Sequence, residues 1–267
     1  MVSGLESLDP VTLALIVAAG FGAGWIDAVV GGGGLLQLPA LLAVPGITPV
    51  QALATNKLGS VFGTTTSAVT YARRVRPDLR TALPMAGVAL AGAFGGAAVA
   101  TVLPASVFKP IILAAIVAVA LFTAFRPQLG QYTQLRLRGR MHLAAACGLG
   151  AVIGFYDGLI GPGTGSFLVI GLVSGIGYAF LEASAKAKIV NMATNLGALI
   201  LFAVFAPQGT LLWGLGLALG AANMCGGYVG ARMAVARGNG FIRWVFLGVV
   251  AVLAVRLGVD VWTEGLG

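Results

Sequence analysis

Residues 24–34 read GWIDAVVGGGG, and residues 154–165 read GFYDGLIGPGTG. In both stretches an aspartate precedes a glycine-rich break by four residues: Asp27 precedes Gly31, and Asp157 precedes Gly161. In a helix interior Gly costs about 1 kcal/mol and Pro about 3 kcal/mol relative to Ala, so neither run stays helical cheaply. Both stretches therefore predict a helix that breaks inside an apolar segment.

The second stretch is one part of a repeat that runs through the chain. Further pairs at nearly the same spacing are Lys57 with Lys188, Gly92 with Gly226 and Gly96 with Gly230. Such self-similarity indicates repeated structural units, and small loop insertions account for the drift in spacing. The predicted organisation is an N-terminal transmembrane repeat over 1–125, a cytoplasmic basic linker over 126–141 and a C-terminal transmembrane repeat over 142–267.

The composition around these breaks is that of a membrane protein. Of 267 residues, 58% are hydrophobic and only 9% are charged, and the mean hydropathy is +0.98. A soluble domain carries roughly 25% charged residues. Too few charges remain to cover a water-facing surface, which excludes a soluble globular enzyme, a disordered tail and a nucleic-acid binder.

The apolar segments define the expected fold. They cover residues 11–30, 35–44, 50–71, 79–103 and 105–125, and then 142–160, 166–176, 180–205, 211–236 and 241–262. We predict an all-α polytopic membrane protein with about eight transmembrane segments. Each repeat has one glycine-broken helix followed by three long transmembrane helices. The sequence leaves open whether the broken segments are re-entrant or span the membrane completely.

The net charge of +8 is concentrated in short loops. Those loops hold Arg73, Arg74, Arg76 and Arg80; Arg126, Arg136, Arg138 and Arg140; and Arg232, Arg237 and Arg243. Short basic loops are typical of the cytoplasmic side of a membrane. The basic loop comes one segment later in the second half than in the first, which predicts an inverted-topology repeat with both termini outside. A plain count of apolar segments instead gives parallel halves.

Four charged residues fall inside the apolar segments: Asp27, Lys57, Asp157 and Lys188. A charge at a helix centre costs about 2.5–3.5 kcal/mol on insertion scales, so these side chains are expected to face the protein interior. Free N–H groups and positive helix ends at the breaks favour an anion. The predicted substrate-binding residues are Lys57, Lys188, Asn56, Ser60, Asn191, Asn195, Gly32, Gly33, Gly163 and Thr164.

The same residues admit structural interpretations. Each lysine is also a candidate strut paired with an aspartate, and the glycines are also candidates for close helix packing. Asp27 and Asp157 are candidate carriers of a coupling proton, because burial disfavours the ionised form of a carboxylate, and equally candidate structural partners. Lys186 is expected at the membrane interface, paired with Glu182. With one histidine and two separated cysteines, the sequence predicts no metal, no cofactor and no catalytic residue.

Taken together, these motifs resemble the sulfite exporter TauE/SafE family of membrane transporters. The resemblance rests on WIDAVVGGGG (25–34), ALATNKL (52–58), GFYDG (154–158), GPGTGSF (161–167) and AKAKIVN (185–191), and it covers nearly the whole chain. It implies a bacterial inner-membrane carrier for sulfite, sulfonates or related sulfur anions.

We therefore expect a secondary transporter for a small anion. A passive anion channel, or a carrier for a non-sulfur organic anion, remains an alternative. The expected partners are the anion and membrane lipid, with no nucleic acid. The small-residue pairs Gly92–Gly96 and Gly226–Gly230 indicate close helix packing and leave room for a homodimer.

Overall fold

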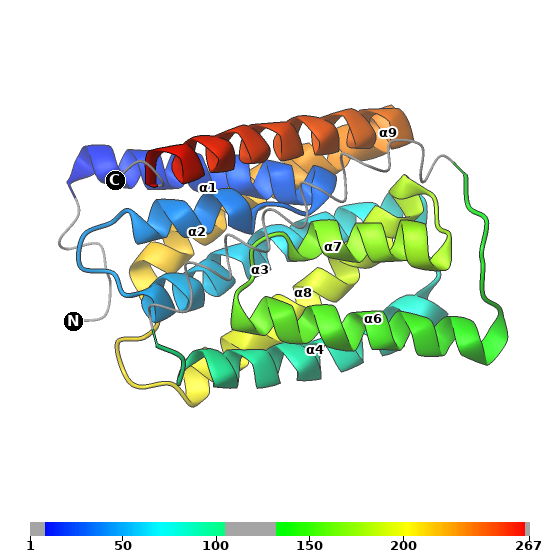
Figure 1. Ribbon diagram of the computed structural model, residues 1–267, viewed down its shortest axis with the longest axis horizontal. Helices are drawn as coiled ribbons and strands as arrows, with labels where there is room; N and C mark the ends of the chain where they lie inside the picture. Colours follow the sequence, from blue (N-terminus) through cyan, green and yellow to red (C-terminus); the bar gives the residue numbers. More distant parts are fainter. Residues whose placement is uncertain (1–8, 105–131, 265–267) are drawn as a thin grey trace.

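The computed structural model describes residues 9–104 and 132–264, and all regular structure in these ranges is helical. The first half contains α1 (Pro10–Val30), α2 (Gly34–Leu42), α3 (Pro49–Val75) and α4 (Leu79–Ala100). The second contains α6 (Gly139–Leu159), α7 (Thr164–Ile170) with the π-helical turn η1 (Gly171–Ile176), α8 (Phe180–Val204) and α9 (Trp213–Glu264). The long helices extend roughly along the long axis of the molecule (Figure 1). The predicted helix over 105–125 lies outside the described residues.

Local capping explains where α1 and α3 begin. Asp9 accepts hydrogen bonds from the backbone N–H groups of Val11 and Thr12, at 2.9 and 3.0 Å. Thr48 and Gln51 form a capping box at the start of α3, and Pro10 and Pro49 occupy first-turn positions. A capping side chain satisfies backbone donors that have no partner within the helix, and proline has no such donor to leave unpaired.

Both predicted helix breaks are confirmed. Helix α1 ends at Val30 and is capped by Gly31, whose φ of 85° is left-handed, and α2 begins at Gly34. Helix α6 ends before Gly161, with φ of 93°, and α7 follows Gly163, with φ of 82°. Because only glycine adopts such angles without strain, these positions turn the chain sharply inside the protein.

The two breaks lie against each other. The backbone N–H of Ser166 donates to the carbonyl oxygen of Gly31 at 3.0 Å, and the Ser166 hydroxyl donates to that of Val30 at 3.0 Å. A Cβ atom on Gly31 would overlap the backbone of Gly165, and one on Gly165 would overlap Gly31. The glycines therefore serve both interpretations of the sequence: they break the helices and they allow backbones to touch.

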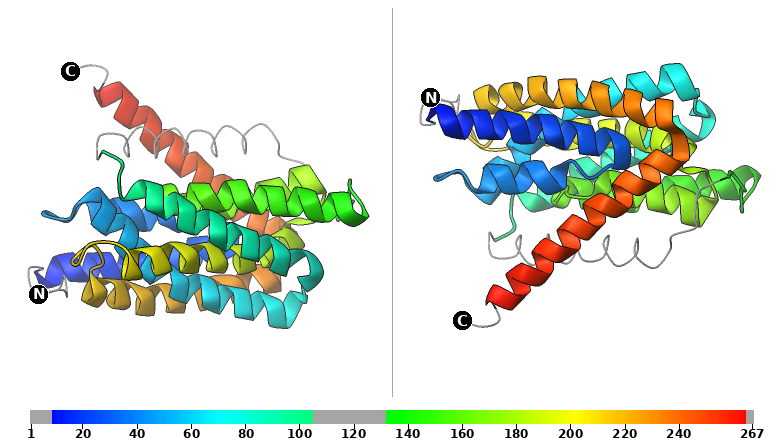
Figure 2. Two further views of the ribbon diagram at one scale, coloured as in Figure 1. Left: turned by 90° about the horizontal axis from the view of Figure 1, so that it is seen from below. Right: turned by 90° about the horizontal axis from the view of Figure 1, so that it is seen from above.

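Four helices of the described part are long and apolar enough to cross a membrane: α1, α4, α6 and α8. At 1.5 Å per residue, their 21 to 25 residues match a hydrocarbon core about 30 Å thick. The last two predicted segments are the two arms of α9, which bends at Gly238 where φ is 69° and ψ is −162°. Figure 2 shows the second arm returning at an angle across the molecule.

Helices from the two halves pack in reciprocal pairs. Helix α4 packs on α6, α1 packs on α9, and in each pair glycines approach backbone carbonyls of the partner helix. The contacts are Gly92 to Ala151 and Gly96 to Phe155 between α4 and α6, and Gly226 to Phe21 and Gly230 to Trp25 between α1 and α9. The predicted close packing at these small-residue faces is thus made by helices of the same chain.

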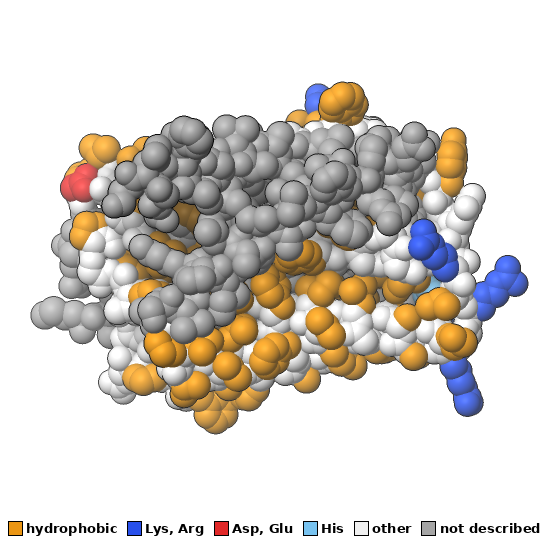
Figure 3. All heavy atoms as spheres, in the orientation of Figure 1, with side chains coloured by type: hydrophobic (Ala, Val, Ile, Leu, Met, Phe, Trp, Pro, Cys, Tyr) orange, Lys and Arg blue, Asp and Glu red, His pale blue; other side chains and the backbone are white. Residues whose placement is uncertain are grey.

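The arrangement of the ends follows from the helix directions. Helices α1 and α6 run in opposite directions, and α1 begins at the same end of the molecule at which α9 finishes (Figures 1 and 2). Arginines 73, 74 and 80 flank the turn from α3 to α4, and Arg136, Arg138 and Arg140 lie at the start of α6. The Lys and Arg side chains visible in Figure 3 gather toward this other end.

The contact between the breaks predicts a graded loss of stability. We expect Gly31→Ala to lower the free energy of unfolding by about 3 kcal/mol or more, because the new Cβ meets Gly165 as well as an unfavourable φ. Gly46 also has a left-handed φ, 84°, but nothing lies within 4 Å of its Cβ position. Gly46→Ala should therefore cost only about 1–2 kcal/mol. Denaturation midpoints in detergent test this, and equal losses would show that the contact contributes nothing.

Candidate functional site

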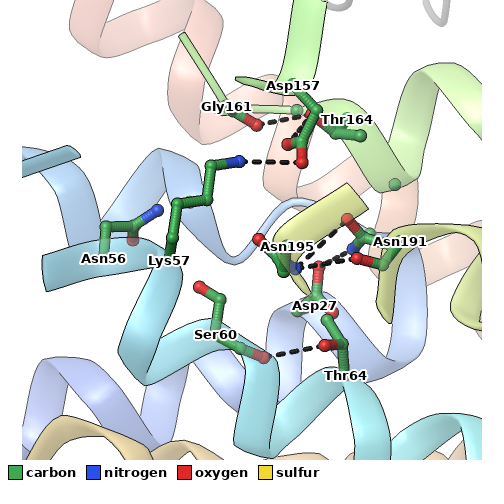
Figure 4. A pocket seen from close by; sticks show the side chains of 14 residues that line it. Asp27, Asn56, Lys57, Ser60, Thr64, Asp157, Gly161, Thr164, Asn191 and Asn195 are labelled. Carbon is green, nitrogen blue, oxygen red and sulfur yellow. Dashed lines mark hydrogen bonds and ion pairs between the residues drawn. The ribbon is translucent and has the colours of Figure 1, made fainter. Parts of the chain in front are cut away.

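A small polar cavity lies where the two breaks meet α3 and α8 (Figure 4). Its volume is about 20 Å³, enough for one water molecule. The lining residues come from both halves: Asp27, Gly31, Gly34, Asn56, Lys57, Ser60 and Thr64 from the first, and Asp157, Gly161, Gly163, Thr164, Gly165, Asn191 and Asn195 from the second. Polar and ionisable residues inside a bundle of apolar helices are typical of a pathway for a substrate or an ion.

Two buried ion pairs connect the halves at this cavity. Lys57 Nζ of α3 lies 2.7 Å from Asp157 Oδ2 of α6, and Lys188 Nζ of α8 lies 2.9 Å from Asp27 Oδ2 of α1. Both lysine side chains are 1% exposed. Each lysine thus pairs with the aspartate of the other half, and the four groups have no net formal charge when all are ionised.

Each aspartate is also held by neutral donors. The Thr164 hydroxyl donates to Asp157 Oδ1 at 2.5 Å, and Asn191 Nδ2 donates to Asp27 Oδ1 at 3.3 Å. Lys188 Nζ donates to the Asp27 backbone carbonyl as well. Buried charges are tolerated when they are both paired and hydrogen-bonded, and both carboxylates meet this condition.

The structure brings together most of the residues predicted for the site. Asn56, Lys57, Ser60, Gly163, Thr164, Asn191 and Asn195 line the cavity with both aspartates, while Lys188 reaches it through Asp27. The glycine register is shifted, because Gly31 and Gly34 line the cavity and Gly32 and Gly33 do not. A Cβ on Gly33 would instead meet Ala23 of α1. Sequence alone cannot say which members of a four-glycine run face inward.

Two supporting residues were not predicted from the sequence. Gln37 of α2 and Asn223 of α9 are buried, and Asn223 Nδ2 donates to Gln37 Oε1 at 2.5 Å. Gln37 Nε2 in turn donates to the backbone carbonyl of Asn56 at 3.4 Å. This chain of amides ties α2 and α9 to the cavity-lining part of α3. The available signal was a polar amide isolated in an apolar run, LLQLPALL for Gln37 and ALGAANM for Asn223.

A second polar cluster lies outside the cavity, near the start of α8. Lys186 Nζ lies 3.7 Å from Glu182 Oε1, which confirms the predicted pair, and 4.5 Å from the ring centroid of Tyr178. Lys186 is fully buried within the protein, and its expected position at the membrane interface stays a prediction. The Tyr178 hydroxyl lies 2.8 Å from Nε2 of His142. The Tyr178 ring and the Glu182 carboxylate together stabilise the buried ammonium group of Lys186.

The fold and the site define a class of protein. Apolar helices long enough to span a bilayer, broken helices that meet inside the protein and buried charges around a cavity are the features of a multi-pass membrane transporter. Comparison with known proteins identifies the family. The family model for the sulfite exporter TauE/SafE matches residues 16–257, and the chain belongs to this family of transporters, not to an enzyme family.

Individual relatives agree with this assignment. A probable membrane transporter protein, ORF9, of Sinorhizobium sp is 41% identical over 249 residues, which cover 93% of each chain. The probable membrane transporter protein YfcA of Escherichia coli K12 is 32% identical over 256 residues, covering 96% of this chain and 93% of its own. A probable membrane transporter protein of Haemophilus influenzae is 35% identical over 235 residues, covering 86% of this chain and 88% of its own. No solved structure matches the chain.

Proposed function

We propose that the protein is a proton-coupled secondary transporter that moves a small sulfur oxyanion, such as sulfite, or an organosulfonate across the inner membrane. The observation that carries the proposal is the pair of buried lysines at one cavity, each held by an aspartate of the other half. The description of the matched family model, a sulfite exporter, supports the substrate class.

The ion pairs suggest how a proton and an anion would be coupled. When a proton neutralises Asp157, Lys57 loses its counter-charge and becomes available to an anion. Protonation of Asp27 would make Lys188 available to the anion in the same way. Ser60, Asn56, Asn191 and Asn195 would then orient the oxyanion through hydrogen bonds, because hydroxyl and amide groups donate to oxyanion oxygens. Binding of the anion and of the proton would thus favour each other.

The cavity volume adds a conformational requirement. A cavity of about 20 Å³ accommodates one water molecule and is too small for a sulfur oxyanion. Loading the site therefore requires the halves to move apart around the breaks. We assign the structure to a closed, ion-paired state of the transport cycle.

We further propose that the halves, 1–125 and 142–267, are inverted repeats. The opposite directions of α1 and α6, the exchanged ion pairs and the matched glycine contacts support this relation. In such repeats, rocking of one half against the other exposes a central site to each side alternately. The positive-inside rule assigns the arginine-rich end to the cytoplasm and both termini to the outside.

Transport into proteoliposomes tests the function. We expect saturable uptake of labelled sulfite or taurine, with accumulation above the external concentration when a pH gradient is imposed and loss of that accumulation on adding a protonophore. Protein-free liposomes are the control. Uptake that neither saturates nor exceeds equilibrium would identify a channel, and competition only by carboxylates would identify a carrier for another anion class.

A further inference from the structure

A second basic feature lies away from the transport cavity, between α3 and the first arm of α9. The two helices approach closely, since a Cβ on Gly227 would lie 2.8 Å from the Gly63 carbonyl oxygen. Toward their ends a cleft of about 180 Å³ opens between them, far larger than the central cavity. Its lining residues are Val69, Thr70, Arg73, Arg74, Tyr228 and Arg232.

The charge of this cleft is uncompensated. Arg73, Arg74 and Arg232 are exposed, and no acidic side chain lines the cleft. Among residues 9–104 and 132–264, none of the three guanidinium groups is in an ion pair. Three cations around one hollow attract an anion, and the planar guanidinium group binds phosphate through two parallel hydrogen bonds.

One of the arginines is held in place by its neighbour. Arg232 Nη1 donates to the Tyr228 hydroxyl at 2.9 Å, and its guanidinium carbon lies 5.4 Å from the Tyr228 ring centroid. A side chain fixed in this way loses less rotamer freedom when it binds a ligand. The tyrosine also gives the cleft a half-exposed aromatic wall, the amphipathic surface usual at headgroup depth.

A polarity gradient along both helices indicates the source of the anion. Helices α3 and the first arm of α9 both run toward the arginine-rich end (Figures 1 and 2). Nearer the membrane centre both helices present an apolar side chain outward, with Val69 43% exposed on α3 and Met224 44% exposed on α9. Cationic groups above apolar side chains match a phospholipid, whose phosphate group and acyl chains meet at this depth.

We propose that this cleft binds the phosphate group of an anionic phospholipid from the leaflet at the arginine-rich end. The acyl chains lie along the outer faces of α3 and α9, and the three arginines hold the phosphodiester. Basic pockets between transmembrane helices are a common means of lipid-headgroup recognition. Inorganic phosphate, which has no acyl chain, binds much more weakly.

Native mass spectrometry of the full chain in detergent, titrated with phosphatidylglycerol, tests the site. We expect Arg73→Gln/Arg74→Gln/Arg232→Gln to weaken binding about 100-fold, from three lost lipid–arginine interactions. The matched control, Arg136→Gln/Arg138→Gln/Arg140→Gln, removes equal charge from an exposed segment at the same end and should change binding less than about threefold. Equal losses in the two variants would mean general electrostatic attraction and would overturn the proposal.

Two further arms distinguish the ligand and guard against misfolding. Phosphatidylcholine and inorganic phosphate are titrated in parallel, and displacement of phosphatidylglycerol by equimolar inorganic phosphate would contradict a lipid site. Arg232→Lys keeps the charge but removes the planar guanidinium group and its hydrogen bond to Tyr228. We expect it to fold with an unchanged denaturation midpoint and to bind about tenfold more weakly. Unchanged affinity in this variant and in the triple variant would refute the site.

Discussion

Lys57→Ala will reduce anion transport at least about 100-fold. Removing one member of a buried, hydrogen-bonded charge pair typically costs 2–5 kcal/mol or more, and here the lysine is also the proposed anion ligand. The loss is expected in the initial rate of uptake into proteoliposomes, normalised to the amount of protein reconstituted. Lys188→Ala should behave in the same way, because its ammonium group has the equivalent pairing with Asp27.

A double variant separates anion binding from a purely structural role of Lys57. Lys57→Gln/Asp157→Asn removes both charges together, and replacing a whole buried pair is often neutral or stabilising. We expect this protein to have the denaturation midpoint of the unmodified chain and still not transport. Lys186→Gln is the control, because Lys186 is a fully buried lysine outside the cavity, and it should keep transport. Substantial transport by the double variant would show that Lys57 has only a structural role.

Asp157→Asn will uncouple anion movement from protons. Asparagine resembles the protonated carboxyl in shape and charge, so Lys57 becomes permanently available while the carrier of the proton is lost. One pH unit is worth about 1.36 kcal/mol per proton, which corresponds to about tenfold accumulation of a co-transported anion. In the variant, the accumulation ratio should fall to about one.

Exchange of labelled for unlabelled anion across the liposome membrane serves as the control for this variant. Exchange needs no net proton movement, so we expect it to continue in Asp157→Asn, and the combination of exchange without accumulation identifies lost coupling. Asp27→Asn tests the other half in the same assay. Undiminished pH-driven accumulation in both variants would exclude these aspartates as the proton carriers.

The helices and their breaks could be predicted because they depend on local chemistry. The runs GGGG and GPGTG disfavour a helix wherever they occur, and the structure breaks there. Insertion costs likewise predicted that Asp27, Lys57, Asp157 and Lys188 would be buried, and all four are. These conclusions require only the preferences of single residues and the thickness of a bilayer.

The pairing of these charges could not be predicted, because it depends on how the halves pack. Spacing along the chain gives no reason why Lys57 should meet Asp157, 100 residues away, rather than Asp27. The same applies to Lys186, whose burial depends on Tyr178 and Glu182, and to the inward-facing members of the glycine run. The inverted relation of the repeats stays a prediction, and the identity of the anion is a prediction that the transport assays address.

In the proposed transport cycle, the exchanged pairing of the two lysines and two aspartates also disfavours a leak. A continuous water-filled passage between the halves would have to separate Lys57 from Asp157 and Lys188 from Asp27 at the same moment. Since breaking a single buried pair is already costly, a conformation open to both compartments is strongly disfavoured. On this mechanism, a cell that stores energy as an ion gradient would not dissipate that gradient through the protein.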